Sequence, residues 1–259
     1  MIIDRFFFQK YQERRDFRMD DRNLAKERKT LGILGGMGPE ATGVLYDRIT
    51  GHTVASKDQD HLDIWIYSHA GLPDRTECIL KGEDEKMRSM LREDTEHMIS
   101  IGCSYLAVPC NTCHYFGDVF REFHDITFID MIDETARFIC GKGISKVGIL
   151  ATDGTNKAGL YEKALKDYGV NTMIPDEKHQ EMLMGLIYQE IKKGLKGDPE
   201  HFSPVVQYLE QEGCEAVILG CTELSVYAET YRLTDSFYVD ALDVLARRCV
   251  ELCGGIWHD

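Results

Sequence analysis

Two short segments of this sequence recur in the same order further along the chain. LGILGGMG at 31–38 resembles VGILATDG at 147–154, an offset of 116 residues, and LAVPCNT at 106–112 resembles VILGCTE at 217–223, an offset of 111. Buried strands are rich in Val, Ile and Leu, so short matches between them arise easily. A Cys that ends the equivalent strand in both halves is harder to explain by chance. The two similar offsets therefore predict a duplicated half-domain.

Alternating apolar runs and helical patterns predict the fold class. LGILGG at 31–36 is typical of a strand and a Gly-rich turn, and Pro39 stands just inside the next helix, where its missing N–H costs nothing. Further strands are expected at 62–68, 105–110, 146–150 and 216–221, and helices at 87–99, 159–169, 182–194 and 205–213. Such alternation favours parallel sheets with helices on both faces. We expect an α/β protein of two pseudo-symmetric Rossmann-like half-domains, each a parallel sheet flanked by helices.

The domain boundaries follow from the repeat and from a change in composition. Residues 1–30 contain nine Lys/Arg and six Asp/Glu around the aromatic cluster Phe6–Phe8, unlike the acidic remainder. They are interpreted as an N-terminal extension, which is either an arm that packs on a partner subunit or sequence upstream of an internal start at Met19. We expect a first half-domain at 31–128, completed by a C-terminal helix at 240–259, and a second at 129–239.

Charge and hydropathy exclude several classes of function. The formal net charge is -14, so the field of the whole protein repels nucleic acid and anionic lipid surfaces. No apolar run reaches the length of a membrane span, and we expect neither nucleic acid nor membrane as a partner. The nine Cys follow a charged start without a secretory signal, which favours a reducing cytoplasm over a disulfide framework.

Cys110 and Cys221 each follow a predicted strand. Ligands of parallel sheets bind beyond the carboxyl ends of the strands, where helix N-termini point N–H groups into the crevice. A free thiol has a pKa of about 8.5, and a helix N-terminus can lower it, although burial opposes this effect. The alternative is that both are small buried residues, the commonest role of Cys. Their symmetric placement favours a chemical role.

Nearby residues leave other interpretations open. Cys110 and Cys113 form a C-x-x-C, which is found in redox dithiols and in halves of zinc sites, and His114 follows as a surface or core residue. No second metal-binding pair completes a tetrahedral site, and no metal is expected. Arg75, in PDRT at 73–76, can grip a carboxylate bidentately or form a surface ion pair with Asp74 or Glu77.

The segment GMGPEA at 36–41 fits the dinucleotide-binding pattern G-x-G-x-x-A. Such a site also needs an acidic residue after the second strand, where this chain has Ser68 and His69. The glycines are better interpreted as letting backbone amides approach a small carboxylate.

Several blocks resemble, in order and approximate spacing, the aspartate racemase branch of the aspartate/glutamate racemase superfamily. They are GGMGPEAT at 35–42, PDRT at 73–76, PCNTCH at 109–114, ATDGT at 151–155 and GCTEL at 220–224. The resemblance extends from residue 31 to the C-terminus. It implies an active site in the cleft between two α/β halves, a homodimer, and catalysis without a cofactor.

The resemblance also implies roles for individual residues. Cys110 and Cys221 would be the acid and base on opposite faces of the substrate α-carbon, with Arg75 near a side-chain carboxylate. The remaining substrate-binding candidates are Gly36, Met37, Asn111, Thr112, Thr152, Thr222 and Lys178. Ser68-His69 departs from the Asn that relatives often have, which leaves the side-chain specificity open.

We therefore expect racemisation of an acidic amino acid, aspartate or alternatively glutamate, by proton transfer between two cysteines. Removal of an α-proton leaves a carbanion that needs aimed donors and an environment without water. Other expectations remain: a decarboxylase or dicarboxylate isomerase on the same scaffold, a catalytically silent module that binds an acidic amino acid, or a thiol redox protein.

Overall fold

The computed structural model describes residues 28–258, so nearly all of the predicted extension at 1–30 lies outside the described residues. The first sheet contains β1 (Leu31–Gly35), β2 (Ile64–Ser68), β3 (Tyr105–Ala107) and β4 (Thr127–Ile129), and the second contains β5 (Lys146–Leu150), β6 (Asn171–Met173), β7 (Ala216–Leu219) and β8 (Tyr238–Asp240). All pairs are parallel, in the orders β2-β1-β3-β4 and β6-β5-β7-β8. The two sheets thus have the same topology, which confirms the predicted pair of α/β halves.

Helices connect the strands in both halves. They are α2 (Pro39–His52), α3 (Arg75–Lys81), α4 (Glu85–Ser100), α5 (Gly117–Arg121), α6 (Met131–Gly141), α7 (Asp153–Ala158), α8 (Leu160–Lys166), α9 (Glu177–Gly185), α10 (Pro199–Gln211), α11 (Thr222–Tyr231) and α12 (Ala241–Leu252). Short turns are η2 (Asp58–Asp60), η3 (Thr112–Phe116), η4 (Leu186–Glu190) and η5 (Ile191–Lys193). No helix within residues 28–258 is both long and apolar enough to cross a membrane.

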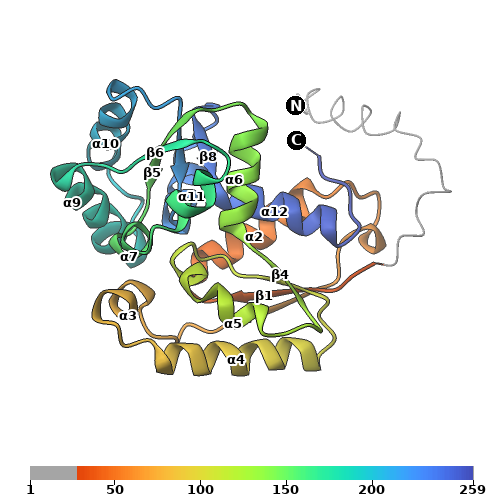
Figure 1. Cartoon of the computed structure of the whole chain (residues 1–259). Coiled ribbons are helices and arrows are strands. Elements are labelled where there is room, and N and C mark those ends of the chain that lie inside the picture. Colours follow the sequence, from red (N-terminus) through yellow and green to blue (C-terminus); the bar gives the residue numbers. More distant parts are fainter. Residues whose placement is uncertain (1–27, 259) are drawn as a thin grey trace.

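The strands alternate their side chains between two cores. Leu31 and Ile33 of β1 point into a core shared by both sheets, whereas Leu34 joins a separate core under α4. In β5, Val147 likewise faces the shared core, and Leu150 faces an outer core with α9 and α10. Because successive side chains of a strand point to opposite faces, β1 and β5 are buried on both sides, whereas the edge strand β2 leaves Trp65, Ile66 and Tyr67 exposed. Figure 1 shows the resulting layers, with α2 and α12 between the two halves and α4 on the outer face of the first.

The helices that follow the fourth strands cross between the halves. Asp130 caps α6 by accepting from the amide of Ile132, and Asp240 caps α12 by accepting from that of Leu242. From there α6 packs on α8 of the second half, and α12 packs on α2, β3 and β4 of the first. We propose that α12 completes the first half-domain, as the boundary at residue 240 implies. This exchange ties the halves together and holds the cleft between them.

Some elements differ from the sequence pattern. The three-residue strands β4, β6 and β8 are too short to show a period of their own, so the alternation did not locate them. The helix expected at 182–194 is instead the end of α9 followed by a π-helical turn, η4, and a 3₁₀ turn, η5. Single π turns inside helices often accompany functional sites. Here this irregular segment borders the cleft.

Candidate active site

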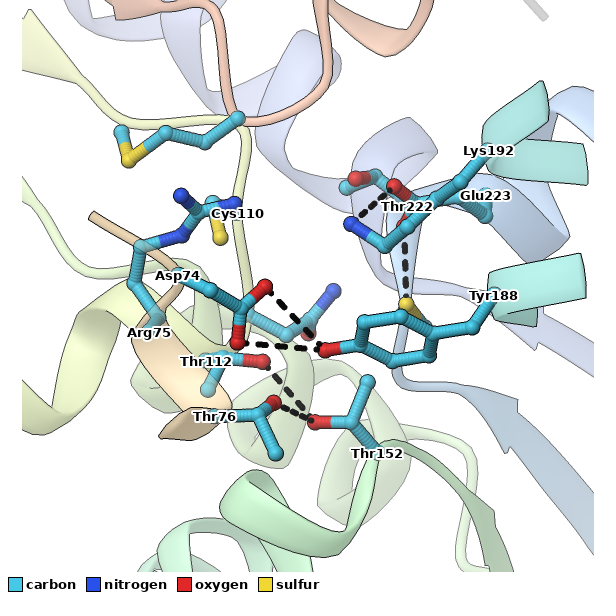
Figure 2. Close-up of a pocket in the computed structure, with 13 residues that line it drawn as sticks. Asp74, Arg75, Thr76, Cys110, Thr112, Thr152, Tyr188, Lys192, Thr222 and Glu223 are labelled. Carbon is cyan, nitrogen blue, oxygen red and sulfur yellow. Dashed lines mark hydrogen bonds and ion pairs between the residues drawn. The ribbon is translucent and has the colours of Figure 1, made fainter. Parts of the chain in front are cut away.

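A pocket of about 260 Å³, partly open to solvent, lies between the two halves. The residues that line it come from both sides: Met37, Asp74, Arg75, Thr76, Cys110, Asn111 and Thr112 from the first half, and Thr152, Tyr188, Lys192, Cys221, Thr222 and Glu223 from the second. Figure 2 shows Arg75 and Cys110 on one side, and Tyr188, Lys192 and Glu223 on the other. Most of the residues predicted from the motifs therefore meet in one place.

Cys110 lies in the buried loop between β3 and η3. The helical segment that follows it is a short 3₁₀ turn, which offers a weaker dipole than the α-helix expected from the sequence. The guanidinium of Arg75 lies beside Cys110 instead (Figure 2). Burial is the largest influence and lowers the pKa of Arg75, but Cys110, Cys113 and Asp74 together outweigh it, so the pKa of Arg75 is raised. Positive charge near Cys110 thus comes from a side chain.

Cys221 is the N-cap residue of the ten-residue helix α11. Its Sγ donates to Oε2 of Glu223 at 2.9 Å, and Oε1 of Glu223 lies 2.9 Å from Nζ of Lys192. Burial raises the pKa of Cys221 well above its usual value, and the charge of Glu223 raises it further. The expectation that a helix dipole would lower this pKa is therefore wrong for Cys221, because burial and the carboxylate outweigh the dipole.

Two buried donors at the pocket lack a hydrogen-bond partner among residues 28–258: Nε of Arg75 and Nδ2 of Asn111. Arg75 uses Nη1 on the carbonyl of Pro73 at 2.8 Å, which fixes the guanidinium. The hydroxyl of Tyr161 donates to Oδ1 of Asn111, which leaves the amide hydrogens of Asn111 unused. A buried donor without an acceptor costs about 1–3 kcal/mol. Both donors therefore favour a ligand that brings acceptor oxygens.

Threonine hydroxyls form a connected group at the same pocket. The Oγ1 atom of Thr152 lies 3.3 Å from Oγ1 of Thr76 and 3.0 Å from Oγ1 of Thr112. The Oγ1 atom of Thr112 also lies 2.9 Å from Oγ1 of Thr155. All of these side chains are buried. Because a hydroxyl can both donate and accept, the group can reorient to suit a bound carboxylate or ammonium.

Lys178, the lysine chosen from the sequence, is exposed on α9 and does not line the pocket. The lysine at the pocket is Lys192 in η5, and Tyr188 in η4 reaches the same space. Burial is the largest influence and lowers the pKa of Lys192, but Glu223, Cys221 and Cys110 together more than offset it, so the pKa is raised. Sequence reasoning missed both residues because Tyr188 lies within the π turn and Lys192 follows it, where the helical period breaks. Lys192 and Lys193 resembled an ordinary basic helix end.

The Gly-rich turn has a structural role at Gly36. Its φ is +89°, and a Cβ there would lie 2.5 Å from the carbonyl carbon of His69, so only glycine fits against the end of β2. The Gly36 amide donates to Oγ1 of Thr42 at 3.0 Å, and Gly36 does not line the pocket, whereas Met37 does. A dinucleotide phosphate would need that amide. His69 turns away to Asp94, with Nδ1 2.8 Å from Oδ2.

His114 and Cys113 are buried away from the chemistry. His114 Nδ1 lies 2.9 Å from the Cys110 carbonyl, and Nε2 accepts from the Met131 amide at 3.0 Å, which sets a neutral ring with the proton on Nδ1. Burial lowers the pKa of His114 and raises that of Cys113 well above its usual value. All nine cysteines are free thiols. His114 therefore supports the Cys110 loop.

Two similar parallel α/β halves, each placing one cysteine on a shared polar pocket, define a class of enzymes with paired thiols between half-domains. The family model for Asp/Glu/Hydantoin racemase matches residues 34–249, and the chain belongs to that family.

Individual proteins that are similar to this chain are also racemases or racemase homologues. The structure of Picrophilus torridus aspartate racemase is similar with a TM-score of 0.78 at 31% identity, covering 88% of this chain and 96% of that one. An aspartate racemase homologue from Pyrococcus horikoshii OT3 has a TM-score of 0.69 at 27% identity, covering 87% and 99%. The broad specificity amino-acid racemase RacX of Bacillus subtilis (strain 168) is 24% identical over 202 residues, which are 75% of this chain and 86% of RacX.

Proposed function

We propose that this protein interconverts L- and D-aspartate by proton transfer between Cys110 and Cys221. That the chain is an amino-acid racemase follows from its family. The aspartate racemase among its structural relatives, at 31% identity, supports aspartate as the substrate. The broad specificity of RacX makes glutamate and other amino acids the alternatives.

One observation carries the choice of an acidic amino acid. The pocket that contains both thiols also contains two cations, Arg75 and Lys192, together with the unpartnered donor of Asn111. A dicarboxylate brings two anionic groups for these cations and acceptor oxygens for the donors. Asp74 lines the same pocket, where its carboxylate caps α3 and accepts from the Tyr188 hydroxyl, and it supplies a negative charge for the substrate ammonium. Charge and hydrogen-bonding capacity therefore match aspartate.

The chemistry follows from the placement of the groups. One cysteine, as thiolate, takes the α-proton, and the other, as thiol, gives a proton to the opposite face of the α-carbon. The negative charge that develops spreads into the α-carboxylate, where fixed donors such as Asn111 and the threonine hydroxyls can hold it. Burial of both thiols limits water near the carbanion. One proton is taken up and one is released, so no oxidant or reductant is needed.

The test is a screen of L- and D-amino acids with purified protein and no added cofactor, followed by chiral chromatography. We expect either enantiomer of aspartate to approach an equal mixture. Release of carbon dioxide or formation of a dicarboxylate isomer would instead indicate another carbon-acid enzyme. Binding of aspartate without turnover would indicate a binding module. Either result would contradict the proposal.

We further propose that the protein is a cytoplasmic homodimer that acts on a small molecule alone. The free state of all nine cysteines supports a reducing compartment. Light scattering after gel filtration gives the mass in solution, to be compared with 29.6 kDa for one chain. A monomer that is fully active would remove the dimer from the proposal.

A further inference from the structure

The two cysteines occupy equivalent places in the repeat, but their neighbours differ. Two residues after Cys110 stands Thr112, whereas two residues after Cys221 stands Glu223. The Cys221 thiol donates to the Glu223 carboxylate at 2.9 Å, while the Thr112 hydroxyl is engaged with Thr152 and Thr155. The duplication therefore conserves the thiol but places a carboxylate beside only one of the pair.

The groups around Cys221 favour its protonated form. Glu223 is buried and lies in contact with the sulfur, and the hydroxyls of Tyr188 and Tyr161 approach from η4 and α8. The nearby cation is Lys192 of η5, whose Nζ forms an ion pair with the other carboxylate oxygen of Glu223 at 2.9 Å. This ion pair between Lys192 and Glu223 thus lies beside the thiol. An ionised carboxylate that accepts the thiol hydrogen opposes loss of that hydrogen.

Gly38, the N-cap residue of α2, supports the same charge state. A Cβ on Gly38 would lie 3.5 Å from Oε1 of Glu223, so the carboxylate approaches the amino end of this fourteen-residue helix. A negative charge is favoured at that end of a helix dipole. Glu223 therefore has favourable electrostatic neighbours in α2 as well as in η5.

The charged groups near Cys110 are mainly positive, unlike the carboxylate that contacts Cys221. Arg75 of α3 lies beside the sulfur (Figure 2), and Lys192 approaches across the pocket. Cys113, the other titratable neighbour, is a fully buried thiol whose pKa is raised, and it carries no charge. The carboxylate of Asp74 also lines the pocket, where it accepts from the Glu77 amide and the Tyr188 hydroxyl, so no hydrogen-bonded carboxylate holds the Cys110 thiol among residues 28–258.

We propose that Glu223 is a positioning residue that holds the proton of Cys221, so that Cys221 is the proton donor of the pair in the ligand-free protein. This inference rests on the proposed two-thiol function and gives each thiol its starting role. For the enantiomer whose α-proton faces Cys110, Cys110 takes that proton and Cys221 gives up its own to the opposite face, whereas the other enantiomer reacts with the minor form in which Cys221 is the base. After that turnover the negative charge lies on Cys221, beside Glu223, which disfavours this form. Solvent then returns a proton to Cys221 and accepts one from Cys110, which restores the resting state.

The test is the pH dependence of alkylation at each thiol in the ligand-free protein, with iodoacetamide as probe and mass spectrometry to quantify each modified cysteine. Because the thiolate is the reacting form, the pH midpoint reports ionisation, whereas access to the pocket changes only the maximal rate. We expect a lower midpoint for Cys110 than for Cys221, with exposed Cys140 as the reference thiol. Equal midpoints, or the reverse order, would overturn the proposal without any variant.

Glu223→Gln removes the charge and keeps the size of the side chain. We expect the Cys221 midpoint to fall by about one pH unit or more, because a contacting like charge shifts a pKa by that order. The Cys110 midpoint should stay in place, and Glu223→Asp, which keeps a carboxylate, should stay closer to the parent. Glu210→Gln, on the exposed face of α10, is the matched control. A Glu223→Gln protein that melts like the parent and keeps its Cys221 midpoint contradicts the proposal.

Alkylation does not depend on turnover, so the two proposals can fail separately. A parent protein with the expected midpoints that racemises no amino acid would overturn the proposed function and leave this assignment of protons standing. A protein that racemises aspartate with the midpoints reversed would overturn only the role of Glu223.

Discussion

The hydroxyl of Tyr161, on α8 of the second half, donates to Oδ1 of Asn111, in the Cys110 loop of the first. This contact crosses the interface between the halves and decides which end of the Asn111 amide is free. Oδ1 is occupied, so the NH₂ group remains for a ligand. Tyr161 is fully buried and does not itself line the pocket. A residue outside the site therefore sets the direction of a donor inside it.

Tyr161→Phe should weaken catalysis without removing a pocket residue. The amide of Asn111 loses its anchor and can turn, so kcat/KM for aspartate should fall by about 5- to 30-fold, and stability should fall by about 1–3 kcal/mol for the unpaired buried oxygen. Kinetics and urea unfolding measure both effects. Tyr168→Phe, at an exposed tyrosine, should change neither. An unchanged kcat/KM in Tyr161→Phe would argue against the anchor.

Arg75→Lys should lose much of the activity. Lysine keeps the charge but not the planar fork, and it cannot present the unpartnered Nε donor of Arg75. We expect kcat/KM for aspartate to fall at least about tenfold, which corresponds to about 1.4 kcal/mol. Arg92→Lys, at an exposed ion pair with Glu122, is the control. Parental turnover of aspartate by Arg75→Lys would end the role assigned to the guanidinium.

Cys110→Ala and Cys221→Ala should each abolish racemisation, because a methyl group can neither take nor give a proton. The Ser variants should be strongly impaired, since a hydroxyl is a far weaker acid than a thiol. In deuterated water the parent should deliver solvent deuterium mainly to the product enantiomer, because the donor thiol is not the base. Cys140→Ala, at an exposed thiol, should retain full activity. Substantial racemisation by either active-site Ala variant is incompatible with two-thiol chemistry.

Lys192 and Lys178 provide a direct comparison of two lysines. Lys192→Met removes a cation from the pocket and should raise KM for aspartate by about tenfold or more, as expected for loss of a partly buried charge contact. Lys178→Met changes only the exposed face of α9 and should leave KM unchanged. Steady-state kinetics of both variants decide between them. A larger effect at Lys178 would mean that the pocket residues are assigned wrongly.

Buried thiols should make the fold less stable at alkaline pH. Burial raises the pKa of Cys249 well above its usual value, so in the folded state this group keeps its proton when the unfolded chain has lost it. Its contribution is complete below the unfolded pKa of about 8.5 and is lost as pH rises toward the folded pKa, at about 1.4 kcal/mol per pH unit. Urea unfolding at pH 8, 9 and 10 should show this decline, which should be shallower in Cys249→Ala. Cys140→Ala should follow the parent, and an identical slope in all proteins would refute the linkage.

Much of the fold could be predicted because parallel strands and their helices leave local patterns. The repeat between 31–38 and 147–154 predicted two similar halves, and those segments form β1 and β5 with the turns that follow. Strands β4, β6 and β8 escaped detection, since their pairing partners, not their own sequence, make them strands. The break at η4 escaped for the same reason, because a π turn depends on packing around it.

The sequence by itself determined the residues that chemistry requires: two cysteines at strand ends, Arg75 after its N-cap Asp74, and the polar residues beside each thiol. Motif spacing carries this information because a strand end and a helix start are local. Only the tertiary structure decided that Lys192 and not Lys178 faces the pocket, that Tyr161 orients Asn111, and that Lys192 pairs with Glu223. These relationships join residues from different elements, and the distances between such residues are set by how the helices and sheets pack, which no local pattern encodes.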